Sequence, residues 1–276
     1  MIEFGKGEAF RQPGWLERAG APFRGPLAHS RLKGPLKRLY DAALDRMPGD
    51  RLVCRFPDGE KVRLAAAYRQ VVWNAEEYGA FRAQVSDGNV VFDVGANLGG
   101  YTMLFGQWVG ERGKVYAFEP APVARGGLIR HVALNALGRR VVVRPEAMSS
   151  ADGTARFRAS GLNGDNRLAA DVGHAIEVTT TSLDSFCGTH GLRPTFIKLD
   201  VEGAELDVLR GARETFASIG DGLTVYVELH PHLWPAFGYA RADVERELDH
   251  QRLRVERIDG GPDPWNLQGV CLRLCR

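Results

Sequence analysis

The sequence predicts an α/β fold built around a mostly parallel sheet. Apolar segments of strand length recur along the chain, at 90–94, 114–119, 140–144, 195–200 and 224–229. Segments of helical length and spacing separate them, at 101–109, 122–137, 204–217 and 241–252. Strands that alternate with helices in this way indicate βαβ units, which assemble into a mostly parallel sheet.

Two units precede this alternation. Residues 1–50 mix Gly, Pro and Arg and predict an irregular basic arm with one short helix around 36–46. Residues 51–89 predict an N-terminal cap, in which LVCRF and KVRLA form a hairpin around Pro57-Asp58-Gly59 and VVWNAEEYGAFRAQV forms a helix. Residues 90–276 form the third unit, which carries the alternating strands and helices.

Two features interrupt or close the main domain. ARFRA (155–159) and IEVTTTSL (176–183) predict an extra β-hairpin around the polar loop SGLNGDNRLAADVG. VERI (255–258) and VCLRLC (270–275) predict a closing pair of strands.

Composition limits the classes of function. Hydrophobic residues make up 44% and charged residues 25% of the chain, which are ordinary globular values, and the net charge of +2 gives no overall attraction to nucleic acid. No apolar run approaches the roughly 18 residues needed to span a bilayer, and the N-terminus lacks the apolar segment of a signal peptide. The four cysteines form no CxxC pair. We therefore expect a cytoplasmic protein with reduced thiols and no membrane insertion.

The loop in VVFDVGANLGGYTMLFG (90–106) predicts a cofactor site, because a Gly-rich turn between a strand and a helix directs backbone N–H groups at a ligand. A dinucleotide loop follows G-x-G-x-x-G, but the corresponding positions here are Gly95, Asn97 and Gly100. The Asn97 side chain and the Asp93 charge argue against a diphosphate. They favour S-adenosylmethionine, which has a cationic sulfonium and no phosphate. Glu119 ends the second strand, where an acid accepts the ribose hydroxyls of either cofactor.

Five separated motifs make the chain recognisable: VFDVGANLGGYT, VYAFEPAP, TSLDSF, FIKLDVEGAELDVLRGA and VELHP. In this order and spacing, over about Val72 to Leu229, they resemble the FkbM family of S-adenosylmethionine-dependent methyltransferases. The resemblance implies a class I methyltransferase, Rossmann-like fold: a mostly parallel seven-stranded sheet with helices on both faces, here with the hairpin insertion and an N-terminal extension. It also implies methyl transfer to a hydroxyl of a sugar, glycan or polyketide-like natural product.

Together with the loop, the resemblance gives a set of expected cofactor-binding residues. They are Asp93, Gly95, Asn97, Gly99, Tyr101, Thr102, Glu119, Pro120, Glu146, Ala147 and Asp200.

The acceptor hydroxyl must lose a proton, which requires a general base or a metal ion. Asp200 and Glu228 lie at the ends of two strands, and His230 follows Glu228 by two residues, so we expect these three at one catalytic site. They could instead hold a divalent ion; the metal-free base is favoured. Glu202 and Glu205 begin the next helix, where helix-dipole complementation is the alternative explanation, favoured for Glu205.

The acceptor pocket has further candidates. Arg167 and the other polar groups of the loop 161–167 suit a hydroxyl-rich acceptor, although an ordinary surface loop has the same composition. His232 and Trp234 could form a wall for a sugar ring, with packing in the core an equal alternative for Trp234. The expected partner is a small-molecule or glycan acceptor, without nucleic acid, and a homo-oligomer stays open. The alternatives are an NAD(P)-dependent oxidoreductase, a non-catalytic cofactor-binding module and, less favoured, an RNA methyltransferase.

Overall fold

The structure, a computed structural model, describes residues 52–158, 167–168, 175–261, 264–265 and 270–276. The arm 1–50, with its expected helix, lies outside these residues, as does most of the loop 160–173.

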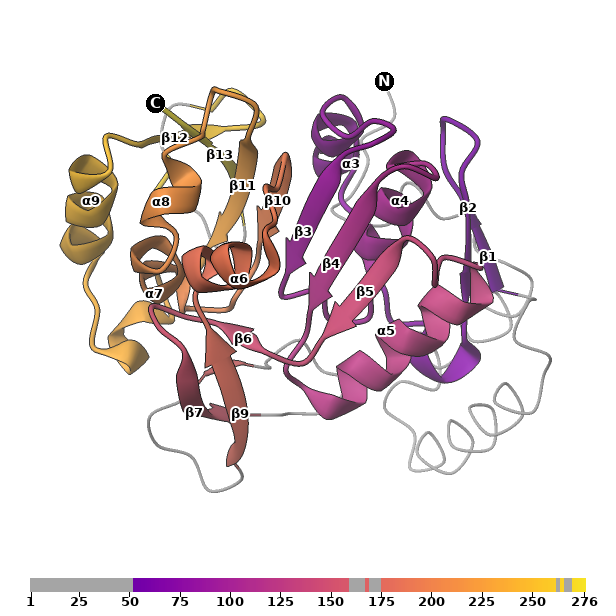
Figure 1. The fold of residues 1–276 in the computed structure, drawn as a ribbon, viewed down its shortest axis with the longest axis horizontal. Helices are drawn as coiled ribbons and strands as arrows, with labels where there is room; N and C mark the ends of the chain where they lie inside the picture. The colour runs from indigo at the N-terminus through magenta and orange to yellow at the C-terminus, as the bar shows by residue number, and fades with distance from the viewer. Residues whose placement is uncertain (1–51, 159–166, 169–174, 262–263, 266–269) are drawn as a thin grey trace, which may run out of the picture.

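A seven-stranded sheet forms the centre of the molecule (Figure 1). Its strands, in spatial order, are β12 (Arg254–Arg257), β13 (Val270–Cys275), β11 (Thr224–Leu229), β10 (Phe196–Leu199), β3 (Val90–Val94), β4 (Lys114–Phe118) and β5 (Val141–Arg144). Neighbours from β11 to β5 are parallel, and β13 is antiparallel to both β11 and β12. This order confirms the expected mostly parallel sheet with a closing strand pair, and it is the arrangement of a class I methyltransferase fold.

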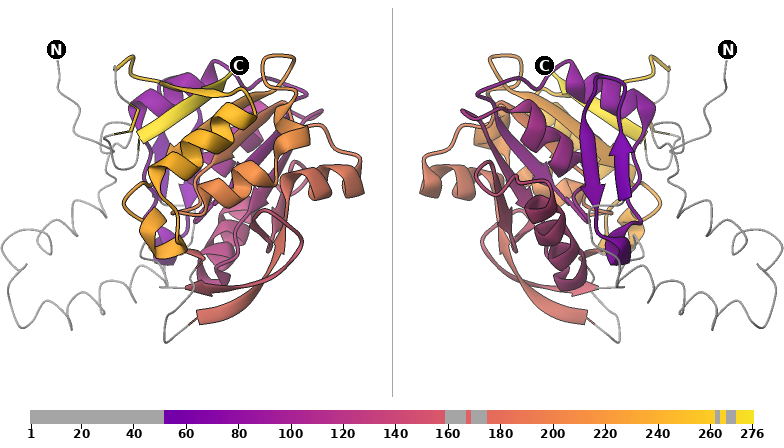
Figure 2. Two further views of the ribbon diagram at one scale, coloured as in Figure 1. Left: turned by 90° about the vertical axis from the view of Figure 1, so that its left-hand side faces the viewer. Right: turned by 90° about the vertical axis from the view of Figure 1, so that its right-hand side faces the viewer.

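Helices cover both faces of the sheet, as Figure 2 shows from two sides. One face carries α3 (Ala75–Arg82), α4 (Gly100–Trp108) and α5 (Pro122–Leu134). The other carries α6 (Leu183–His190), α7 (Glu205–Arg210), α8 (Arg213–Phe216) and α9 (Arg241–His250). Successive strand residues point to opposite faces, so Val91 packs in the first layer and Phe92 in the second, both fully buried.

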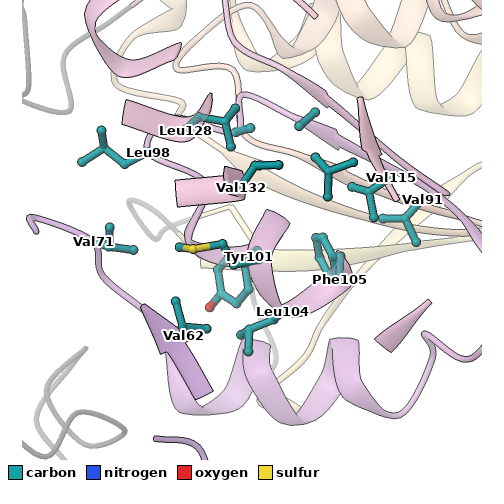
Figure 3. Packing of buried hydrophobic residues seen from close by; sticks show 14 of the residues in the cluster. Val62, Val71, Val91, Leu98, Tyr101, Leu104, Phe105, Val115, Leu128 and Val132 are labelled. Carbon is teal, nitrogen blue, oxygen red and sulfur yellow. The ribbon is translucent and has the colours of Figure 1, made fainter. Parts of the chain in front are cut away.

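The N-terminal hairpin packs on the same face as α4 and α5. Its strands are β1 (Leu52–Arg55) and β2 (Lys61–Leu64), followed by the short 3-10 helix η2 (Ala66–Tyr68). Figure 3 shows Val62 of this hairpin close to Leu104 and Tyr101 of α4. The expected hairpin is therefore present, and it contributes to the main hydrophobic core.

The predicted insertion is part of a second, four-stranded sheet. Its strands, in spatial order, are β6 (Ala147–Met148), β9 (Ala175–Thr181), β7 (Gly153–Arg158) and β8 (Arg167–Leu168). The hairpin of β7 and β9 matches the expectation, whereas the two-residue strands β6 and β8 have no signal in the sequence pattern.

Three of the expected elements differ from the structure for reasons that local contacts explain. The helix expected over 71–85 begins at Ala75, because the Asn74 side chain accepts the N–H groups of Glu76 and Glu77 and caps it. The strand expected over 176–183 ends at Thr181, since Ser182 caps α6, a helix that the sequence pattern did not predict.

The third difference is the helix expected over 204–217, which is divided into α7 and α8 around Gly211 and Ala212. A Cβ atom at Gly211 would lie 2.2 Å from the Ser149 carbonyl oxygen, so the chain approaches β6 too closely there for any larger residue. A second short 3-10 helix, η3 (Trp234–Phe237), lies between β11 and α9. None of the helices in the described part of the chain combines the length and apolar character that crossing a bilayer requires.

Candidate active site

A pocket opens at the carboxyl ends of β3, β4 and β10, where the strand order reverses direction and ligands bind in open α/β sheets. It encloses about 580 Å³ of empty space, the part open to solvent included. Its walls are formed by Val94, Gly95, Asn97, Phe118, Glu119, Pro120, Glu146, Ala147, Met148, Phe157, Asp200, Val201, Glu202 and Ala204. The structure thus brings Gly95, Asn97, Glu119, Pro120, Glu146, Ala147 and Asp200, all expected at the cofactor, to one pocket.

The Gly95 loop forms the floor between β3 and α4. Gly95 has φ +77°, and a Cβ atom there would lie 1.8 Å from the Asp200 carbonyl oxygen, so only glycine fits. The N–H groups of Gly95 and Ala96 each donate to the Phe118 carbonyl at 3.0 Å. The loop is therefore fixed to the end of β4 and pressed against the end of β10.

The remaining expected cofactor residues, Asp93, Gly99, Tyr101 and Thr102, do not line this pocket. Asp93 is 1% exposed and accepts a 2.5 Å hydrogen bond from Thr102 Oγ1. Burial raises the pKa of Asp93, while Lys198 and the Thr102 hydroxyl oppose that rise. Tyr101 packs edge-on against Phe81 in the core. These residues support the loop from behind.

Glu119 faces the pocket from the end of β4 with a side chain that is almost fully buried. Its Oε2 accepts the Asn97 N–H at 2.7 Å, and its Oε1 accepts the Ala121 N–H at 2.8 Å. Burial raises the pKa of Glu119 to about 7, although both hydrogen bonds lower it. Each carboxylate oxygen retains a second acceptor position, so ligand hydroxyls can still bind there.

The insertion sheet closes the opposite wall with Ala147 and Met148 of β6 and Phe157 of β7. Glu146 lies beside them and is paired with Arg144, whose Nε is 3.1 Å from Glu146 Oε2. This wall is largely apolar and suits the face of an aromatic ring.

The expected catalytic residues Asp200, Glu228 and His230 come together next to this pocket. His230 Nε2 lies 3.6 Å from Glu228 Oε1 and 3.9 Å from Asp200 Oδ1. β10 and β11 are parallel neighbours, which places Asp200 and Glu228 at adjacent strand ends. Asp200 lines the pocket, whereas Glu228 and His230 are not among its lining residues.

Glu202 is a pocket residue that the sequence analysis left out of the site. Its Oε2 lies 3.7 Å from His230 Nε2, and its side chain is 31% exposed. Burial raises the pKa of Glu202 to about 7, with His230 opposing the rise. Its backbone has φ +51°, which turns the carboxylate into the pocket; its spacing of two from Asp200 was the available signal.

His230 is buried and surrounded by acids. Burial lowers the pKa of this imidazole, but hydrogen bonds and charges from Glu205, Glu228 and Asp200 outweigh that effect and raise the pKa to about 11. Nδ1 lies 2.8 Å from Glu205 Oε1. At neutral pH the ring therefore carries a positive charge within the acidic cluster.

A second cation lies on the other side of Asp200. Lys198 Nζ is 3.1 Å from Asp200 Oδ2 and 5.6 Å from the centre of the Tyr101 ring. Burial lowers the pKa of Lys198, but Asp200, Asp93, Glu228 and Glu77 together raise it. The Asp200 carboxylate is thus already paired.

A metal ion has one plausible set of ligands in the described part of the chain. One donor atom each from Asp200, Glu202 and His230 lies within 4.8 Å of the others. This set differs from the expected one by Glu202 in place of Glu228. Mixed carboxylate and imidazole donors suit several divalent ions.

Two further expectations for the acceptor side have different outcomes. Trp234 lies in the core at 1% exposure rather than at the pocket, and its Nε1–H donates to Glu205 Oε2 at 2.7 Å. His232 is exposed, with its ring 6.0 Å from that of His230. The polar loop 161–166 lies outside the described residues.

Comparisons with known proteins agree with the motifs. A family model described as Methyltransferase FkbM domain matches residues 93–255. The 31-O-demethyl-FK506 methyltransferase FkbM of Streptomyces tacrolimicus is 32% identical over 200 residues, which cover 61% of this chain and 75% of the relative. The hexuronic acid methyltransferase AglP of Haloferax volcanii is 27% identical over 176 residues, which cover 63% of this chain and 66% of the relative.

The similarity to solved structures is weaker. A crystal structure of methyltransferase FkbM from Methylobacillus flagellatus KT is 20% identical, with a TM-score of 0.45, and covers 68% of this chain and 44% of that one. The fold assignment therefore depends on the strand order of the chain itself.

Proposed function

The chain belongs to the FkbM methyltransferase family, and we propose that it transfers a methyl group from S-adenosylmethionine to a hydroxyl oxygen of a sugar, glycan or polyketide-like acceptor. The observation that carries this proposal is one pocket in which Glu119, the Gly95 loop and Asp200 meet at the reversal point of the sheet. The relatives are named as methyltransferases of 31-O-demethyl-FK506 and of hexuronic acid, which supports a hydroxyl-bearing acceptor.

In this proposal, different pocket residues bind different parts of the cofactor. Glu119 accepts the ribose hydroxyls, and the apolar wall of Met148 and Phe157 holds the adenine ring. The carboxylate of Asp200 attracts the cationic end of the methionine portion. Bound S-adenosylmethionine would supply a methyl group that its sulfonium already activates.

The acceptor proton is taken by a pocket-facing carboxylate, and no metal ion is required. Asp200 and Glu202 line the pocket, whereas His230 does not line it and has a raised pKa. His230 therefore acts as a fixed positive charge that holds Asp200, Glu202 and Glu228 together, and not as the base. The cations Lys198 and His230 already supply charge that a metal ion would otherwise bring.

Calorimetry with S-adenosylmethionine, S-adenosylhomocysteine and NAD tests the proposal. We expect the first two to bind and NAD not to bind, because Asn97 and the buried acids leave no place for a diphosphate. Each titration is run with and without a chelator, so that any contribution of a bound divalent ion is measured separately. Binding of NAD in preference to the methyl cofactors would reassign the chain to oxidoreductase chemistry. Binding of none of them would favour a non-catalytic module.

A further inference from the structure

Glu205 has a more specific environment than a helix-dipole role requires. It is the first residue of α7, and its side chain is 0% exposed. Its Oε1 accepts the Gly203 N–H at 3.0 Å and lies 2.8 Å from His230 Nδ1, while its Oε2 accepts the Trp234 Nε1–H at 2.7 Å. A helix dipole acts without fixed partners, but here both carboxylate oxygens are bound by donors from a loop, a strand end and η3.

The two nitrogens of the His230 ring consequently have different surroundings. An ionised carboxylate only accepts hydrogen bonds, so Nδ1 carries a proton and donates it to Glu205. Nε2, on the far side of the ring, faces Glu228, Glu202 and Asp200 at 3.6, 3.7 and 3.9 Å. A 180° flip of the ring would put Cδ2 in the place of Nδ1 and Cε1 in the place of Nε2, and so leave Glu205 without its donor. A carboxylate that fixes the ring orientation of a functional histidine is a recurrent arrangement in enzyme sites.

We propose that Glu205 is a positioning residue of the acceptor-side site, holding the His230 ring so that Nε2 always faces Asp200, Glu202 and Glu228. Trp234 is the second part of this device, because its indole N–H occupies the other Glu205 oxygen and prevents the carboxylate from rotating. The inference depends on the proposed function only for its consequence in methyl transfer. The orientation of the ring stands on the contacts alone.

The chemistry of a carboxylate and an amide gives a sharp test. Glu205→Leu removes both acceptor oxygens, so the Nδ1–H of His230 loses its partner. In Glu205→Gln/Trp234→Phe, the amide oxygen can accept from Gly203 and His230, while the NH₂ group faces a ring that has no N–H donor. The double variant should therefore keep the contact that Glu205→Leu loses.

The experiment is proton and nitrogen NMR of the apoprotein at neutral pH, labelled at histidine nitrogens, for wild type, Glu205→Leu, Trp234→Phe and Glu205→Gln/Trp234→Phe. We expect a slowly exchanging Nδ1–H signal of His230 in wild type and in Trp234→Phe. It should disappear in Glu205→Leu and be present in the double variant. Glu202→Gln is the control on the other side of the ring, and it should keep the Nδ1–H signal.

Two results would overturn the proposal: a His230 Nδ1–H signal that persists in Glu205→Leu, or a double variant that lacks it. If Glu205→Leu fails to fold, the folded double variant still decides the question. Calorimetry with S-adenosylhomocysteine on the same four proteins should give dissociation constants within about threefold of one another. Failure of all four to bind it would reject the proposed function and leave the result on His230 intact. With an accepted hydroxyl substrate, Glu205→Leu should lower kcat by at least about tenfold at unchanged KM for the cofactor, and the double variant should retain most of the wild-type kcat.

Discussion

The Glu119 carboxylate is buried and also accepts two backbone hydrogen bonds. These two features shift its pKa in opposite directions. Burial raises its pKa to about 7, while the N–H groups of Asn97 and Ala121 favour the ionised form. Ribose hydroxyls donate best to an ionised carboxylate. The affinity of the site for its cofactor must therefore depend on pH near neutrality.

We expect the dissociation constant of S-adenosylhomocysteine to fall by up to about tenfold between pH 6 and pH 8, as Glu119 ionises through pH 7. The same ionisation has the opposite effect on the free energy of unfolding. The folded carboxyl has a raised pKa, so its contribution to the free energy of unfolding falls as pH rises from about 4.5 to about 7. Calorimetry at both pH values measures the first effect. Glu119→Gln should bind more weakly at pH 8 and lose most of the pH dependence; a variant that keeps the full dependence would place the titrating group elsewhere.

Gly95 offers a matched pair of substitutions that separates backbone strain from steric collision. Gly95→Ala combines a positive φ with a Cβ atom 1.8 Å from the Asp200 carbonyl, whereas Gly220→Ala has φ +89° and nothing within 4 Å. Gly220→Ala should lower the free energy of unfolding by about 1–2 kcal/mol. Gly95→Ala should lower it by several kcal/mol more and weaken S-adenosylhomocysteine binding, because β10 must move. Urea unfolding measures both, and equal losses would contradict the collision.

At the scale of elements, the four-stranded insertion sheet forms one wall of the pocket. Phe157 of β7 lines the pocket at 4% exposure, and Val178 of β9 lies on the same face without reaching the lining. The insertion thus forms part of the pocket as well as a sheet of its own.

Phe157→Ala should therefore weaken S-adenosylhomocysteine binding by at least about tenfold, since it removes a ring from the wall and typically costs about 3–5 kcal/mol of stability when such a side chain is buried. Val178→Ala is the control, because it removes buried carbon atoms from the same sheet but leaves the pocket lining unchanged. Calorimetry on the folded variants compares the two. An equal loss of affinity in both would mean that the sheet acts only through stability.

The elements that the sequence pattern predicted are those with a strong local signal. Five apolar strands and four helical segments of the main domain were found from their periodicity, and the closing strand pair from its position. The pattern missed what tertiary contacts decide: the strands β6 and β8, two residues each, and the division of α7 from α8 at Gly211. It also extended α3 over residues 71–74, because the apolar residues Val71, Val72 and Trp73 look like part of the helix in the sequence.

The candidate site was likewise predictable where a local sequence pattern specified it, and not where distant contacts decide. Parallel strand ends meet at one edge, so the convergence of Asp200, Glu228 and His230 followed from spacing, and the structure confirms it. Their chemical roles stay predictions. Glu202 was not placed in the site, although its spacing of two from Asp200 pointed to it, because the strand ends at Leu199 and Glu202 itself has a left-handed backbone with φ +51°. Glu205 was explained as a dipole partner, because its contacts with His230 and Trp234 join residues 25 and 29 positions away.

At the scale of the whole molecule, the cap and the main domain share one hydrophobic core. Phe81 of α3 is fully buried and contacts the rings of Phe196 and Tyr226 in the central sheet, 5.5 and 5.0 Å away between centroids. Val62 and Leu64 of β2 belong to the same cluster. The boundary expected at residue 89 is therefore a change of pattern along the chain and not a division of the core.

We accordingly expect a fragment of residues 90–276 to lack a cooperative unfolding transition, because removal of α3 and the hairpin uncovers the apolar side chains of α4 and the central sheet that they pack against. A fragment of residues 52–276 should retain the transition. Circular dichroism during urea unfolding compares the two. A cooperative transition of residues 90–276 alone would show that the cap is dispensable for folding.

The position of β13 has a consequence for the growing polypeptide. β13 follows β12 in the chain but lies between β12 and β11 in the sheet. During synthesis, β12 therefore has no neighbour to pair with, and the outer edge of β11 stays open, until residues 270–275 leave the ribosome. Open strand edges are templates for pairing with other chains. The nascent chain at this stage should be a client for chaperones, and a ribosome stalled before residue 270 should hold it in an aggregation-prone state.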